Sequence, residues 1–153
     1  MAWTYAQIAA AYNALSPVPA SLAAACDIFK AQNTTLTGQP IAVAGAFGVL
    51  ETSAAGEWAK VTLRSRGTLS GASPPTAADL AVSAAIEAVA LFETAGAVIT
   101  AAEWPLAQSW LSDLEAVGDV SAGSISAIAA LATVVVPTWQ PAVTVGDLQT
   151  AGV

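Results

Sequence analysis

The sequence predicts an all-α protein, built as a compact bundle of about six to eight short helices. Long blocks of the chain are rich in alanine, the strongest helix former, and they end at Pro, Gly, Ser or Thr. Larger apolar side chains recur every three or four residues within these blocks, as they do on one face of a helix. A length of 153 residues suits a single domain, 1–153.

The first half of the chain, residues 1–66, is expected to begin with three helices. Two of them run over about 4–15 and 21–32, and the turn at Ser16–Pro19 separates them because proline removes a backbone donor. The third runs from Pro40 to about residue 50, since proline suits the first turn of a helix.

Residues 57–66 fit two interpretations. Apolar Ala59, Val61 and Leu63 alternate with polar neighbours, which is typical of a half-buried strand. As a helix, the same segment places Lys60 and Arg64 one turn apart. We favour the helix, because a strand needs partners and no other convincing strand is visible, but a minor strand stays possible here.

A linker divides the expected bundle into two helical halves, 1–66 and 76–153. It comprises residues 67–75, with the sequence GTLSGASPP, and is dense in glycine, serine and proline. Because the whole chain is short, both halves are kept in one domain.

The second half is expected to hold three longer helices and a short last turn. The helices run over about 76–95, 105–117 and 124–135. Thr76 and Asp79, like Thr144 and Asp147 near the C-terminus, have the spacing at which two side chains cap the start of a helix. The helix over 76–95 is apolar almost all round, which indicates that it is central in the bundle or lies against a partner.

Composition argues against several classes of function. The chain has no histidine and one cysteine, Cys26, so imidazole chemistry, an internal disulfide and a cysteine-cluster metal site are excluded. The eleven acidic residues are dispersed, and no phosphate loop, nucleophile elbow or dinucleotide motif is present. We therefore expect no catalytic residues, no cofactor, no metal and no small-molecule substrate, and the protein is not expected to be an enzyme.

Charge and hydropathy bear on the partners. The net charge of −7 argues against binding nucleic acid, whose backbone must be neutralised by cations. Three long stretches lack charge, namely 1–26, 31–50 and 120–146, but polar residues, Pro or Gly interrupt each of them. A helix that crosses a membrane needs about 20 mainly apolar residues, so no membrane span is expected.

One concentrated charge feature suggests a surface that binds a partner. Lys60, Arg64 and Arg66 are three of only four basic residues in the chain, and they follow Trp58 closely. Together with Trp58, these three residues are the candidates for a docking patch that binds an acidic surface of a partner. Alternatively, they form a solvated face that offsets local acids such as Glu57.

Tryptophan suggests further contact residues. The chain has five tryptophans but only 10% charged residues, and tryptophan is enriched in interface hot spots. Trp3 and Trp139 are the interface candidates, whereas Trp110 is expected in the core. Fifteen charged side chains are few to solvate a monomer that is 56% apolar, so part of the surface is expected to contact other chains.

Three segments resemble small alanine-rich helical proteins encoded in the structural gene regions of tailed bacteriophages. They are residues 12–35 (YNALSPVPASLAAACDIFKAQNTT), 57–66 (EWAKVTLRSR) and 136–151 (VPTWQPAVTVGDLQTA). The resemblance covers about a third of the chain and is more compositional than chemical. It implies a virion component of the tail, the neck or the capsid periphery, made in the host cytoplasm.

The expected function is therefore that of a non-enzymatic virion structural protein. Its partners would be other virion structural proteins, copies of itself, or both. The alternative is a helical-bundle module that binds a small apolar ligand or a partner helix.

Overall fold

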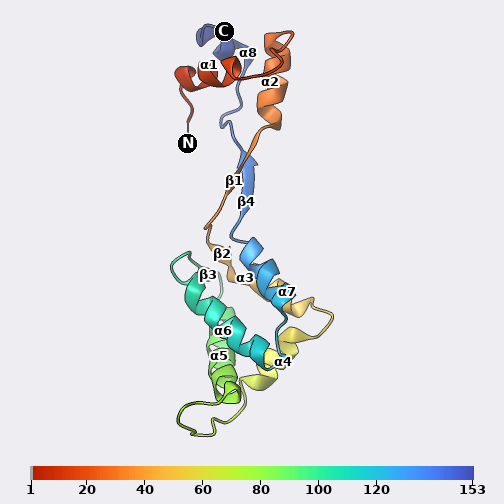
Figure 1. Cartoon of the computed structure of the whole chain (residues 1–153), viewed down its shortest axis with the longest axis vertical. Coiled ribbons are helices and arrows are strands. Elements are labelled where there is room, and N and C mark those ends of the chain that lie inside the picture. Colours follow the sequence, from red (N-terminus) through yellow and green to blue (C-terminus); the bar gives the residue numbers. More distant parts are fainter. Residues whose placement is uncertain (1) are drawn as a thin grey trace. The chain divides into compact units, whose positions relative to one another are not determined.

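A computed structural model describes residues 2–153, which fold into two compact units (Figure 1). The terminal unit comprises the residues up to Leu36 together with Val135–Val153, and the central unit comprises Thr37–Val134. Residues 2–153 contain eight helices, which confirms the mainly helical prediction. They also contain four short strands, which the sequence did not predict.

The terminal unit brings the two ends of the chain together. Its elements are α1 (Tyr5–Asn13), α2 (Leu22–Ala31), β1 (Asn33–Leu36), β4 (Val134–Pro137) and α8 (Val145–Thr150). Helix α8 packs against both α1 and α2. The buried core of this unit consists of Ile8, Ala25, Cys26, Phe29, Val143 and Leu148. Side chains at the helix starts explain where α1 and α8 begin, since Thr4 and Gln7 cap α1 reciprocally, as Thr144 and Asp147 cap α8.

The strand β4 corrects the helix expected over 124–135. Helix α7 (Ala122–Ala130) ends earlier, and residues 134–137 pair instead with β1 in a two-stranded sheet. Val134 to Val136 are β-branched, and such residues favour extended backbone over helix. The hydroxyls of Thr34 and Thr138 lie 2.8 Å apart beside this pair of strands.

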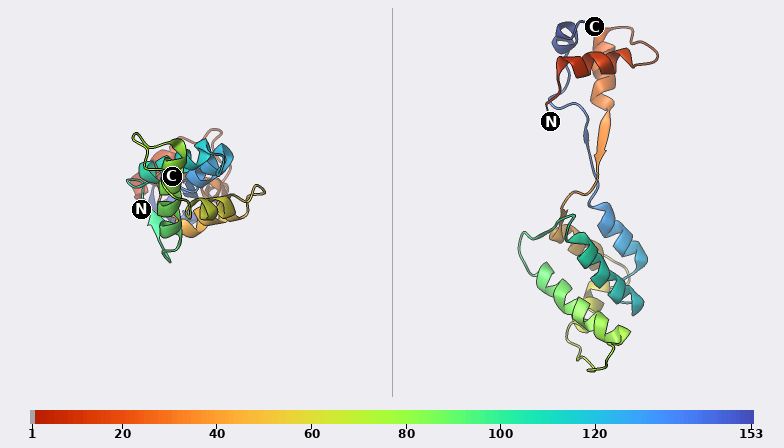
Figure 2. Two further views of the ribbon diagram at one scale, coloured as in Figure 1. Left: turned by 90° about the horizontal axis from the view of Figure 1, so that it is seen from below. Right: turned by 60° about the vertical axis from the view of Figure 1, so that its left-hand side comes forward.

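The central unit holds most of the helices. In addition to α7, its elements are β2 (Ile41–Ala42), α3 (Val43–Glu51), α4 (Glu57–Arg64), α5 (Ala77–Phe92), β3 (Val98–Ile99) and α6 (Trp104–Ala116). Strands β2 and β3 pair in antiparallel fashion, with Ile41 opposite Ile99. Helix α5 packs along α6 and also contacts α4 and α3. Figure 2 shows α5, in green, running beside α6, in teal.

Small side chains let the helices of the central unit approach closely. Its core includes Ala46, Ala81, Ala84, Ala85, Ala88 and Ala107, together with larger residues such as Leu50, Val61, Leu111, Leu114 and Ile128. Four of these alanines lie on α5, whereas Leu80 and Ile86 of the same helix are 44% and 46% exposed, so one face of α5 is buried and another is open.

The structure chooses between the two interpretations of residues 57–66. Residues 57–64 form helix α4, so the helix prediction is confirmed and the minor strand is wrong. Val61 on this helix is fully buried, whereas Leu63 is exposed.

The predicted linker, 67–75, is a loop inside the central unit rather than a boundary between compact units. Asp79 holds it in place. The carboxylate accepts hydrogen bonds from the amide of Ser70 at 2.6 Å, from the Ser70 hydroxyl at 2.7 Å and from the amide and hydroxyl of Thr76. The chain instead passes between units at residues 36–37 and 134–135, because α8 packs on α1 and α2.

Within residues 2–153, no helix has the length and apolar character that a crossing of the bilayer requires.

Candidate functional site

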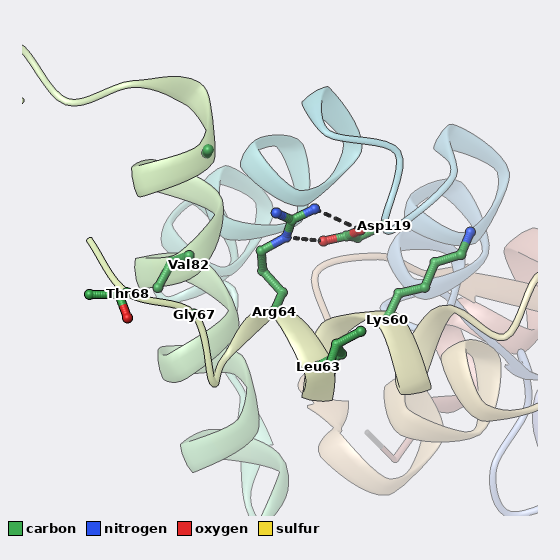
Figure 3. A pocket seen from close by; sticks show the side chains of 8 residues that line it. Lys60, Leu63, Arg64, Gly67, Thr68, Val82 and Asp119 are labelled. Carbon is green, nitrogen blue, oxygen red and sulfur yellow. Dashed lines mark hydrogen bonds and ion pairs between the residues drawn. The ribbon is translucent and has the colours of Figure 1, made fainter. Parts of the chain in front are cut away.

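The predicted basic segment lines an open pocket of about 360 Å³ in the central unit (Figure 3). Helix α4, the loop that follows it, the start of α5 and the turn between α6 and α7 form its walls. The lining residues are Lys60, Leu63, Arg64, Gly67, Thr68, Ala78, Val82 and Asp119.

Arg64 and Asp119 form a two-pronged ion pair across this pocket. Arg64 Nε donates to Asp119 Oδ2 at 2.6 Å, and Nη2 donates to Oδ1 at 3.2 Å, as the dashed lines in Figure 3 mark. The side chain of Arg64 is 31% exposed and that of Asp119 is 10% exposed. Hydrogen bonding to Asp119 raises the pKa of Arg64 above its ordinary value, so the guanidinium stays charged.

Lys60, four residues before Arg64 on α4, also contacts the connection between α6 and α7. Its Nζ lies 3.4 Å from the carbonyl oxygen of Gly118. Gly118 has a φ of +77°, a left-handed conformation that glycine adopts readily at the end of a helix. Two basic side chains of α4 therefore contact the turn between α6 and α7, which is a structural use of the charges that the sequence suggested for docking.

Arg66 and Leu63 remain available at the surface. Arg66 is exposed and makes no ion pair within residues 2–153. The side chain of Leu63 is 71% exposed, although it lies on the same helix as the fully buried Val61. A basic and apolar surface therefore remains beside the Arg64–Asp119 pair.

Glu57 is a buried carboxylate that the sequence analysis assigned to the surface. It is 2% exposed, and its Oε1 accepts a hydrogen bond from the amide of Ser121, the residue that caps α7, at 2.9 Å. Its Oε2 is buried with no hydrogen-bond partner among residues 2–153. Burial raises the pKa of Glu57, but the hydroxyls of Ser124 and Ser121 and the Ser121 amide lower it by more, so the carboxyl is ionised at neutral pH.

A carboxylate at this place compensates the partial positive charge at the start of α7. Neither Glu57 nor Asp119 could be singled out from the sequence, because the partner of each lies more than fifty residues away along the chain.

Trp58 lies against aromatic side chains of its own unit. Its ring is 5.0 Å from the ring of Phe47 and 5.0 Å from that of Phe92, both edge to face. Such pairs stabilise a core beyond the area that they bury. Trp110, expected in the core, likewise packs against the core of the central unit.

Trp3 and Trp139 both belong to the terminal unit. Trp139 packs edge to face on Phe29 at 5.1 Å, and its indole N–H donates to Gln32 Oε1 at 2.7 Å. The indole N–H of Trp3 donates to the carbonyl oxygen of Pro141. Both tryptophans line an open pocket of about 380 Å³. The structure thus brings Trp3 and Trp139 together, and it groups Lys60 with Arg64 separately in the central unit.

Two further observations concern chemistry. In the described part of the chain, residues 2–153, no group of three or more His, Cys, Asp or Glu side chains is arranged to hold a metal ion. An apolar pocket between α3, α5, α6 and α7 has a volume of about 20 Å³, close to the space that one water molecule needs.

Comparison of the chain with protein-family models, with curated proteins and with solved structures finds no match.

Proposed function

We propose that the protein is a non-enzymatic structural component of a tailed-bacteriophage virion. It packs against other tail, neck or capsid proteins through apolar surfaces of its helices, each unit acting as a small helical bundle. The observation that carries this proposal is the exposure of large apolar side chains on a chain with few charges. Leu63 is 71% exposed, Leu106 57% and Leu69 53%, all in the central unit. Exposed apolar surface commonly marks contacts with other proteins.

The resemblance to bacteriophage structural proteins supplies the class of partner. The Arg64–Asp119 ion pair and the buried carboxylate of Glu57 fit this role, because their contacts connect α4 to the turn between α6 and α7 and to the start of α7. The alternative is a module that binds a small apolar ligand or a partner helix; the pocket of about 20 Å³ between α3, α5, α6 and α7 is too small for such a ligand, and we prefer the structural role.

Co-purification with defined partners tests this proposal. The full chain is expressed with each structural protein encoded beside its gene, and the complexes are isolated through a tag on that protein. We expect at least one of them to retain the chain at a fixed ratio. A variant with exposed Leu63, Leu69 and Leu106 all changed to Ser should be retained less, while Leu80→Ser, at a position on α5 that is 44% exposed, serves as a control. Retention by none of these proteins would contradict the proposal.

A further inference from the structure

We infer that the central unit binds a second copy of itself head to tail, with Leu63 of one copy inserted into the apolar groove between α5, β3 and α6 of the next. In this contact Lys60 and Arg66 of the first copy face Glu103 and Glu93 of the second. The inference rests on the proposed structural role and names one of its partners, a second copy of this chain.

The first half of the contact is a projecting leucine surrounded by cations. Leu63 is 71% exposed. With Lys60 and Arg64 of the same helix, it lines the open pocket of about 360 Å³, here called the basic pocket. Arg66 follows immediately after the helix and is exposed. An exposed leucine among basic side chains has the character of an interface anchor with a charged rim.

The second half is an apolar groove with an acidic edge. It has a volume of about 120 Å³ and is lined by Leu91, Val98, Ile99, Glu103, Leu106, Ala107 and Trp110. Val98 is 49% exposed and Leu106 57% exposed, so these walls are open to a partner.

Glu103 is fixed at the edge of the groove and stays ionised. Its Oε2 accepts hydrogen bonds from the Thr100 amide at 2.9 Å and from the Thr100 hydroxyl at 2.7 Å. These bonds hold the pKa of Glu103 below its ordinary range. Glu93, directly after the end of α5, is exposed and adds a second negative charge two residues beyond Leu91, which lines the groove.

The two halves lie at different positions along α5. Val82 lines the basic pocket and Leu91 lines the groove, so nine residues of helix, or about 14 Å at 1.5 Å per residue, separate them. In the proposed head-to-tail arrangement each copy places Leu63 on one neighbour and receives the Leu63 of another, so the contact is heterologous. Such a contact repeats from copy to copy, into a ring if the rotation closes and into a filament if it does not.

Charge selects a second copy as the occupant. Apart from Lys30, every basic side chain lies between residues 60 and 66, and eleven acidic side chains give the chain a net charge of −7. Arg64 is paired with Asp119, whereas Lys60 and Arg66 make no ion pair within residues 2–153. Each copy therefore offers these two cations and an acidic remainder, and complementary charges orient such an encounter.

Two variants, each lacking one of the two contact surfaces, test this inference. Leu63→Asp removes the projecting side of a copy and leaves its groove, whereas Leu106→Asp damages the groove and leaves the projection. Both positions are exposed in the monomer, so each variant should keep its fold, which far-UV circular dichroism checks. Leu80→Asp, at a position 44% exposed, is the matched control.

The mass in solution is measured by light scattering up to about 1 mM chain, so that weak contacts are populated. We expect the wild type and Leu80→Asp to exceed the dimer mass, and Leu63→Asp and Leu106→Asp to be monomers. An equal mixture of these two variants should form a one-to-one dimer, since one intact contact remains. Added salt should weaken all of these species because it screens the charge pairs.

A wild type that stays monomeric, or a mixture of the two variants that stays monomeric while the wild type associates, would overturn the inference. Its failure is distinct from that of the proposed function. A monomer that still co-purifies with a neighbouring virion protein overturns only the head-to-tail contact, whereas failure to co-purify counts against the function itself.

Discussion

The two partners of the Arg64–Asp119 ion pair should differ in how much stability the central unit loses when each is substituted. Arg64→Gln leaves the carboxylate of Asp119, which is only 10% exposed, without its cation. Asp119→Asn leaves a guanidinium that is 31% exposed and reaches water. We therefore expect the arginine substitution to cost more stability than the aspartate substitution.

The expected magnitudes lie between those of exposed and buried pairs. Exposed pairs contribute up to about 1 kcal/mol, and removing one partner of a buried pair costs about 3–5 kcal/mol. With two hydrogen bonds of 2.6 and 3.2 Å and partial burial, the pair is intermediate. Arg64→Gln should cost about 2–3 kcal/mol, Asp119→Asn about 1 kcal/mol, and the two should be coupled by about 1–2 kcal/mol.

Urea unfolding of the wild type, both single variants and the double variant measures this coupling. Far-UV circular dichroism follows the helices, and tryptophan fluorescence sums over five residues, three of which, Trp58, Trp104 and Trp110, belong to the central unit. Arg66→Gln is the control, since it removes an exposed cation without an ion pair and should change stability by less than about 0.5 kcal/mol. If Arg64→Gln is as mild as this control, or the coupling is zero, the pair does not hold the turn between α6 and α7.

Three further predictions concern buried or hydrogen-bonded groups. Glu57→Gln removes the charge beside the start of α7 and should destabilise the protein by about 1–2 kcal/mol in urea unfolding, whereas an unchanged stability would show that the charge is dispensable. Asp79→Asn should lower the melting temperature near pH 6. Because hydrogen bonds from Ser70 and Thr76 hold the pKa of Asp79 below its usual range, the wild-type advantage is complete above the unfolded-state pKa of about 4 and lost as the pH falls through the folded-state value. Melting curves of both proteins at about pH 6 and about pH 2.5 check this, and an advantage that grows in acid would contradict it. Leu148→Ala empties a fully buried position of the terminal unit and should cost about 2–5 kcal/mol, with fluorescence changes at Trp3 and Trp139; a cost below about 1 kcal/mol would show that Leu148 does not anchor this core.

Local chemistry predicted most of the helices. Helix α5 begins where the Thr76–Asp79 capping pair placed its start, and α8 begins at the equivalent Thr144–Asp147 pair. Helix α6 has a proline in its first turn, close to the start expected at Pro105. These features depend on residues within one helical turn, so they are visible in the sequence.

Features that depend on distant partners were not predictable in this way. The strand β4 requires β1, about a hundred residues earlier, and its three valines also fitted the end of a helix. The division into units follows from the packing of α8 on α1 and α2, which no linker in the sequence marks.

The candidate site shows the same contrast. The i, i+4 spacing placed Lys60 and Arg64 on one face of a helix, and both line one pocket. No local pattern indicated that Asp119 would pair with Arg64, or that Glu57 would be buried at the start of α7. The exposure of Leu63 was equally hidden, because a leucine within an apolar pattern is expected inside.

The protein composition of purified virions tests the proposed structural role most directly. Virions of the tailed phage that the proposed role implies as the source of the gene are separated from lysate, washed in salt and quantified by mass spectrometry, with a phage replication enzyme as the negative control. The account predicts that the chain is retained at a constant ratio to the major capsid protein from one preparation to the next. A chain that is abundant in the infected cell but absent from the virion, like the replication enzyme, would contradict it.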